Sequence, residues 1–64
     1  MPQWKKGGNR PTSSDYYIVK ATDGVREWEE ELHYYICPEY GFGVWETLED
    51  EDFTYKIIEW KEKW

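Results

Sequence analysis

Five carboxylates lie within seven residues of the C-terminal half, and no other side chains in this sequence are so well placed to do chemistry together. The stretch Val44 to Tyr55 reads VWETLEDEDFTY, and its acids are Glu46, Glu49, Asp50, Glu51 and Asp52. A group of this kind could hold a metal ion, dock a positively charged partner, or keep an aromatic-rich protein in solution. The rest of the sequence has to decide among these three interpretations.

The spacing of the acids does not fit a dedicated metal site. An EF-hand calcium loop needs oxygen ligands at alternate positions, a glycine at the sixth and a glutamate at the twelfth. Counted from Asp50, the sixth position is Tyr55 and the twelfth is Lys61. A structural zinc site needs four Cys or His ligands, and this sequence contains one Cys and one His. We therefore predict no metal site and no cofactor.

The single cysteine and the single histidine are the pair that could form a thiol nucleophile and its base. Cys37 follows His33 by four positions, which on a β-strand puts both on one face but about 13 Å apart. On a helix the two would approach, yet no third residue is apparent that would orient the imidazole. A lone strand cysteine is more typical of a small core residue. We predict no catalytic residue and no enzymatic activity.

The charge distribution favours a basic protein partner. Residues 11–55 contain twelve acids and two bases, whereas Lys5, Lys6 and Arg10 make the N-terminal stretch positive. The formal net charge of −6 disfavours direct nucleic-acid binding, because affinity for phosphates needs a basic patch. We expect the acidic surface to dock a basic host protein, including one that itself binds nucleic acid. The acidic residues expected to contact it are Glu27, Glu29, Glu31, Glu46, Glu49, Asp50, Glu51 and Asp52.

Composition limits the fold to one small domain. The 64 residues include five Trp, six Tyr and two Phe, and each large ring can bury roughly 150–250 Å². Residues 1–14 are interrupted by Gly, Pro, Asn and Ser and are expected to form a flexible N-terminal arm, followed by a single β domain over residues 15–64. One cysteine forms no internal disulfide, and no apolar run is long enough to cross a membrane. These features indicate a cytoplasmic protein without membrane contact.

The first half of the domain reads as two strands joined by a tight turn. DYYIVKA, residues 15–21, is rich in aromatic and β-branched residues and is followed by the turn residues Asp23 and Gly24. Residues 25–37 then suit a long strand entered from that turn. Glutamates and a leucine spaced for one helical face leave an alternative, an α+β fold in which residues 26–33 are helical.

The second half predicts two more strands. FGVWET, residues 42–47, follows a turn at residues 38–41, and residues 55–61 form the last strand. Between them, Thr47 followed by acids resembles the start of one short helical turn. The expected fold is mainly β, a small four-stranded antiparallel meander in which neighbours in sequence are neighbours in space.

Neither face of the predicted sheet is purely polar. Consecutive apolar residues such as Tyr16 and Tyr17 point to opposite sides, whereas a sheet with one wet face alternates apolar and polar residues. Because so short a chain can hardly cover both faces, we expect a homodimer, a protein-binding face, or both. Curling of the sheet into a small barrel around its own aromatics is the alternative. The aromatic residues expected at an interface are Tyr17, Tyr35, Tyr40, Trp45 and Trp64.

The order of aromatic motifs resembles a family of short phage and prophage proteins of unknown function. The resemblance covers residues 4–60 and rests on Trp4, Pro11, the YYIVK strand with its Asp-Gly turn, the YGFGVWE hairpin and the closing IIEW. This chain departs from that family by its acidity and by lacking a proline-rich ending after the last Trp. The family has no assigned active residues, so none are transferred.

Together these features lead to one functional expectation and one alternative. The resemblance implies a phage or mobile-element origin, and small acidic phage proteins are often inhibitors of host enzymes or defence systems. We expect a non-enzymatic acidic protein that inhibits or redirects a host protein, of the anti-defence or nucleic-acid-mimic type. The alternative is a structural or assembly protein whose aromatic face forms a homo-oligomer.

Overall fold

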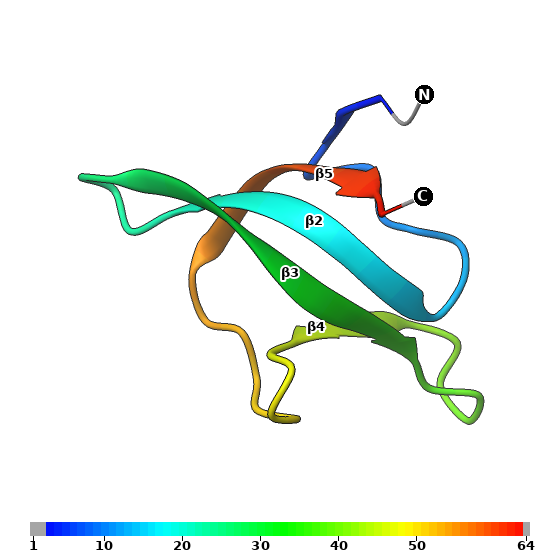
Figure 1. The fold of residues 1–64 in the computed structure, drawn as a ribbon. Helices are drawn as coiled ribbons and strands as arrows, with labels where there is room; N and C mark the ends of the chain where they lie inside the picture. The colour runs from blue at the N-terminus through cyan, green and yellow to red at the C-terminus, as the bar shows by residue number, and fades with distance from the viewer. Residues whose placement is uncertain (1–2, 64) are drawn as a thin grey trace.

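A single antiparallel β-sheet is formed by residues 3–63, the part of the chain that the computed structural model describes (Figure 1). Its strands are β1 (Lys5–Lys6), β2 (Asp15–Thr22), β3 (Glu27–Ile36), β4 (Gly43–Glu46) and β5 (Lys56–Glu62), in the spatial order β1-β5-β2-β3-β4. No helix occurs within residues 3–63. The prediction of a mainly β fold is confirmed.

The expected meander is wrong beyond β4. β5 returns to pair with β2, along the edge of β2 that does not pair with β3. β1 adds a fifth strand outside β5. β2 contributes three buried residues, Tyr17, Val19 and Ala21, and a strand flanked on both sides is shielded better than an edge strand. The pairing also sets Trp60 opposite Val19. Residues 47–55 carry the chain across from β4 to β5, so neighbours in sequence are not neighbours in space here.

Both helical alternatives are also wrong. The helix considered over residues 26–33 is replaced by β3, which is entered from a turn held by Asp23. The Asp23 carboxylate accepts hydrogen bonds from the backbone N–H groups of Val25 (2.8 Å) and Arg26 (2.9 Å), and Gly24 has φ 99°. The short helical turn expected after Thr47 is a β-type reversal instead, in which Asp50 has φ 63°, outside the helical range.

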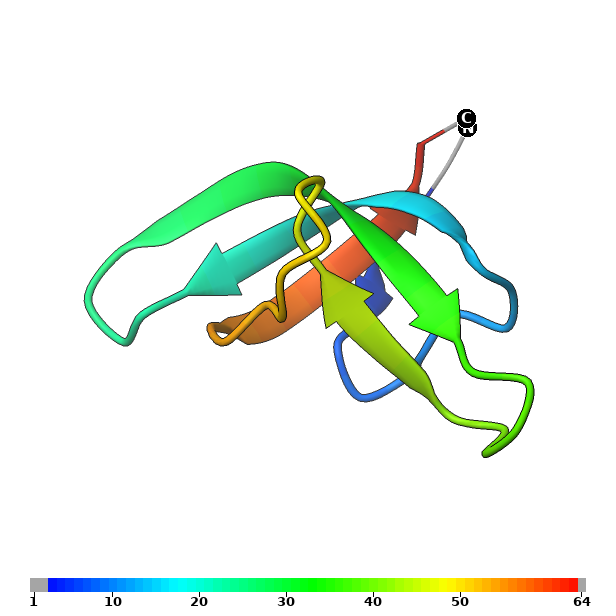
Figure 2. The same ribbon diagram turned by 90° about the horizontal axis from the view of Figure 1, so that it is seen from below.

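The core lies on one side of the sheet, here the inner face. Its buried residues are Tyr17, Val19, Ala21, Leu32, Tyr34 and Trp60. Trp45 of β4 and Trp60 of β5 have ring centroids 6.5 Å apart, although β2 and β3 separate their strands. The sheet therefore curls around its inner face rather than lying flat (Figure 2), as the barrel alternative anticipated in part.

Residues 7–14, here the strap, lie across the inner face and connect the two ends of the curled sheet. The Trp60 indole N–H donates to the Asn9 carbonyl, and the Arg10 guanidinium donates to the Gly43 carbonyl at 3.0 Å. Pro11 is buried, and the Tyr17 hydroxyl donates to the Ser13 carbonyl at 2.9 Å. The described part of the expected N-terminal arm thus packs against the domain and contributes to closing its core.

Candidate protein-binding surface

The five clustered carboxylates are displayed by a small structured reversal, residues 46–52, here the acidic hairpin. Backbone hydrogen bonds join Thr47 N–H to the Glu51 carbonyl (2.7 Å) and Phe53 N–H to the Trp45 carbonyl (3.0 Å). The Thr47 hydroxyl oxygen accepts from the N–H groups of Glu49 (3.3 Å) and Glu51 (3.2 Å). The cluster is therefore held by a hydrogen-bonded backbone and anchored to the core, because Phe53 packs against the buried cluster.

Four of these carboxylates are exposed to solvent. Glu49, Asp50, Glu51 and Asp52 are exposed, and no ion pair within residues 3–63 includes them. Glu46 differs, because it is half-buried and its Oε1 lies 3.6 Å from Nδ1 of His33. The acidic hairpin thus presents a concentration of uncompensated negative charge.

A groove runs between the acidic hairpin and β3. Its lining residues are Glu30, Glu31, Leu32, Thr47, Leu48, Glu49 and Glu51. Leu32 is buried and forms part of the core, whereas Leu48 is 55% exposed. The groove therefore combines carboxylates with one exposed apolar side chain, Leu48, which is a chemistry suited to an amphipathic cation.

The carboxylates predicted on β3 lie elsewhere. Glu27, Glu29 and Glu31 alternate with the inner-face residues of β3 and so lie on the outer face, the side of the sheet away from the core. Glu31 is engaged by Lys63 at 3.0 Å. Within the described residues, Glu27 and Glu29 form no ion pair. The predicted acidic set therefore divides between the acidic hairpin and the outer face, and Glu31 borders both.

The aromatic residues predicted for an interface also divide. Tyr17 is 5% exposed, and Trp45 packs against the core cluster with its ring centroid 4.8 Å from that of Tyr34. Both stabilise the fold in this structure and neither offers a free surface. Tyr35 and Tyr40 are 42% and 70% exposed, as a contact surface requires. Trp64 lies outside the described residues.

His33 and Cys37 are not assembled into a catalytic group. The His33 ring packs between Tyr16, at 4.8 Å between centroids, and Tyr35, at 6.4 Å. Cys37 is a half-buried free thiol that follows β3. Among residues 3–63 no three His, Cys, Asp or Glu side chains are grouped so that they could hold a metal ion.

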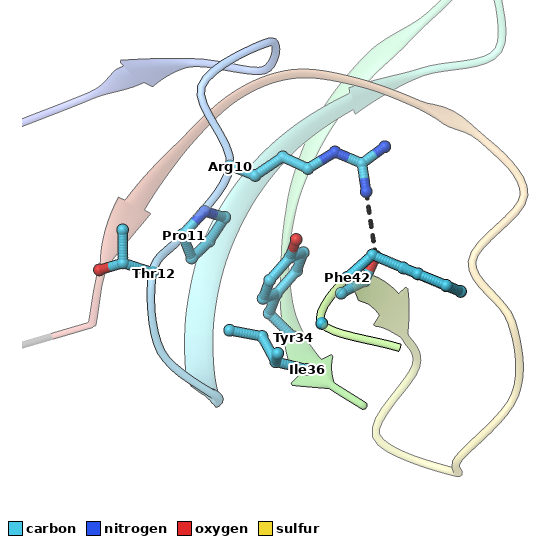
Figure 3. Close-up of a pocket in the computed structure, with 8 residues that line it drawn as sticks. Arg10, Pro11, Thr12, Tyr34, Ile36 and Phe42 are labelled. Carbon is cyan, nitrogen blue, oxygen red and sulfur yellow. Dashed lines mark hydrogen bonds between the residues drawn. The ribbon is translucent and has the colours of Figure 1, made fainter. Parts of the chain in front are cut away.

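Two exposed features were not anticipated from the sequence. The rings of Tyr40 and Phe42 stack at 5.7 Å beyond the ends of β3 and β4. Beside them a second groove lies under the strap, where Arg10 reaches over Tyr34 toward β4 (Figure 3). Strand alternation could not reveal either feature, because both depend on loop residues whose position the pattern does not specify.

Comparison with models of known protein families, with curated proteins and with solved structures finds no match. Within residues 3–63 the structure also contains no helix that could span a membrane. Any functional inference therefore rests on the surfaces described above.

Proposed function

We propose that this protein is a non-enzymatic binding protein whose acidic hairpin docks a basic protein partner. The observation that carries the proposal is the groove between β3 and the acidic hairpin, which carboxylates and the exposed Leu48 line together. A lysine or arginine side chain has an apolar stem and a charged head. The stem would lie along Leu48, and the head would meet Glu49 and Glu51.

The exposed carboxylates would contribute chiefly to partner choice and to the association rate. Exposed ion pairs contribute about 0–1 kcal/mol each, whereas complementary charge steers encounter and excludes wrong partners. Much of the affinity must then come from buried contacts such as those of the inserted stem. We expect binding to weaken with added salt, because exposed charges are screened.

The biological setting belongs to the same proposal. The resemblance to short phage proteins supports a phage or mobile-element protein that acts in the host cytoplasm. Binding at a basic surface would inhibit or redirect a host protein, including one whose basic surface normally contacts nucleic acid. A hydrogen-bonded hairpin carrying adjacent carboxylates supports such mimicry, since it presents spaced negative charges as a phosphate backbone does.

The proposal is tested with a defined basic probe. A short arginine- and lysine-rich peptide is titrated into ¹⁵N-labelled protein, and amide shifts are expected to concentrate at residues 47–52 and 30–32. A hairpin variant (Glu49→Gln, Asp50→Asn, Glu51→Gln, Asp52→Asn) removes four charges and should lose this response. The same pair of proteins then serves as bait in host extract to identify the natural partner.

A matched control separates a docking site from general attraction. Changing Glu27, Glu29 and Glu39 to Gln and Asp15 to Asn also removes four charges, but leaves the acidic hairpin intact. This control should bind the peptide nearly as well as the original protein. Equal loss in both variants, or shifts spread over the whole sheet, would overturn the proposal.

A further inference from the structure

The outer face of the sheet is only partly covered. The Trp4 ring covers one end of it, with its centroid 5.1 Å from Nζ of Lys20 and 4.7 Å from Nζ of Lys61. At the other end Tyr16, Tyr35 and Val44 are 45%, 42% and 39% exposed. Tyr16 contacts His33 across β2 and β3, so these side chains form one continuous apolar strip.

Charges on the outer face are separated by sign. The β3 and β4 side carries the glutamates Glu27, Glu29, Glu31 and Glu46, and the β5 and β1 side carries the lysines Lys6, Lys56 and Lys61 with one acid, Glu59. β2 runs between the two groups. Apart from Glu46, which is the first residue of the acidic hairpin, none of these charged residues belongs to that hairpin.

The strand register places the opposite charges in matching rows. In two rows a residue of β2 has a glutamate on its β3 side and a lysine on its β5 side: Glu27–Thr22–Lys56 and Glu31–Ile18–Lys61. In a third row Glu29 pairs with Lys20, and Lys6 lies beyond Glu59. Glu27 and Glu31 thus each have a lysine at the same level on β5, whereas Glu29 has Glu59 there and Lys6 lies one strand further out.

We propose that two copies of this chain pair through their outer faces, across a twofold axis that runs along β2. That rotation keeps each row at its own level and exchanges its two sides. Glu27 and Glu31 of one copy therefore face Lys56 and Lys61 of the other, twice per dimer, while Glu29 faces Glu59, whose charge is compensated by Lys20. Tyr16 and Ile18 face their own counterparts at the axis, as an isologous interface requires.

The ion pairs formed within one copy leave charges on the outer face available for contact with a second copy. Lys20, which lies at the axis, is compensated by Glu59 at 3.9 Å, so two copies of it do not oppose each other as bare cations. Within residues 3–63 no ion pair includes Glu27, Glu29, Lys6 or Lys56. All four are exposed, and Glu27 and Lys56 are the pair that a second copy would neutralise.

The size of the face is consistent with a modest affinity. Eight residues of β2 at about 3.3 Å each, and five strands about 4.8 Å apart, give a face on the order of 600 Å². Specific interfaces bury about 800 Å² per partner, and transient ones less. We therefore expect a transient dimer, with a dissociation constant on the order of 100 µM, rather than an obligate dimer.

The test uses charge reversal in two complementary variants. An acidic variant carries Lys56→Glu, and a basic variant carries Glu27→Lys. Sedimentation equilibrium at 10–500 µM and low salt should show the original 7.9 kDa chain associating to a dimer. Each variant alone should self-associate at least about tenfold more weakly than the original chain, because like charges then face each other. An equimolar mixture of the two variants should recover the dimer.

Each outcome decides the proposal. A monomer at 500 µM for the original chain would overturn it, as would unchanged self-association of either variant or a mixture that fails to pair. Near-ultraviolet circular dichroism confirms that each variant keeps its aromatic core, since both substituted positions are exposed. The hairpin variant described above should dimerise normally, because its four positions lie outside this interface, so loss of peptide docking and loss of dimerisation are separate results.

Discussion

At the scale of single residues, the contact between Gly43 and Tyr34 determines how β4 meets the core. A Cβ added at position 43 would overlap the Tyr34 ring, and Tyr34 is 2% exposed. The ring cannot move away without disturbing its contact with Trp45, at 4.8 Å between centroids. Glycine is therefore required here by close packing, not by an unusual backbone angle.

The corresponding prediction is that Gly43→Ala destabilises the fold. Overpacking of a well-packed core costs about 1–3 kcal/mol, and that loss should appear in the free energy of unfolding measured with urea. Gly8→Ala is the matched control, since a Cβ there meets nothing within 4 Å. If both variants lost the same small amount, the close packing of Gly43 against Tyr34 would be wrong.

Asp23 gives a prediction about pH. Backbone hydrogen bonds from Arg26 and Val25 hold the pKa of its carboxyl below the ordinary value of 3.8. A depressed folded-state pKa stabilises the fold above the unfolded-state value and ceases to do so as the pH falls through the folded-state value. The difference in unfolding midpoint between the original protein and Asp23→Asn should therefore be full above pH 5 and shrink below pH 3.8. A constant difference down to pH 2 would contradict this.

At the scale of elements, the strap does more than the sequence suggested. Residues rich in Gly, Pro and Ser predicted an arm outside the domain, because that composition seldom forms regular structure. In the structure the strap instead supplies hydrogen-bond partners for Trp60 and Tyr17. Irregular backbone can close a core when it offers carbonyl groups at the right places, and composition does not report where those carbonyls lie.

Arg10→Ala should loosen this closure. Removing the Arg10 bond to the Gly43 carbonyl should cost about 1 kcal/mol and speed exchange of the Trp60 indole proton, because the strap holds its acceptor. Thr12→Ala is the control within the strap, since Thr12 is exposed and forms no hydrogen bond among residues 3–63. Equal exchange rates in the two variants would show that Arg10 does not hold the strap in place.

The strands themselves were largely predictable, whereas their partners and faces were not. β2 and β3 followed from alternation and from the Asp-Gly turn, because both signals are local. The pairing of β5 with β2 is a long-range choice that depends on burying Trp60 against Tyr17, at 5.2 Å between centroids. In the doublet Tyr16-Tyr17, either tyrosine could have faced the core, since a register shift of one residue exchanges the faces. Tyr17 was consequently misplaced at a predicted interface.

At the scale of the whole molecule, the candidate site shows the same division. The exposure of the acidic cluster could be predicted from composition alone, because so many neighbouring carboxylates cannot be buried together, but the hairpin that carries them was not predicted. The groove was not predicted, because β3 residues such as Leu32 line it together with the acidic hairpin, and the two segments are separated in the sequence. The separation of acids and lysines across β2 was also invisible in the sequence, since it requires the spatial order of strands. Surfaces made by one segment can be predicted locally, and surfaces made by several require the fold.

The excess negative charge should make stability depend on salt in a characteristic direction. Four adjacent unpaired carboxylates repel one another, and screening weakens that repulsion as the Debye length falls from about 10 Å at 0.1 M to about 3 Å at 1 M. Raising sodium chloride from 0.05 to 0.5 M should therefore raise the melting temperature of the dilute protein by several degrees, since about 1 kcal/mol corresponds to about 4–8 °C in so small a domain. The hairpin variant, whose net charge changes from −6 to −2, should respond much less.

The protein concentration in this experiment should be 1 µM, far below the expected dimer dissociation constant. Salt weakens the proposed dimer, and at this concentration that opposite effect on stability does not enter the result. A melting temperature that falls with salt would mean that the ion pairs of the outer face, such as Glu31 with Lys63, outweigh the repulsion within the acidic hairpin.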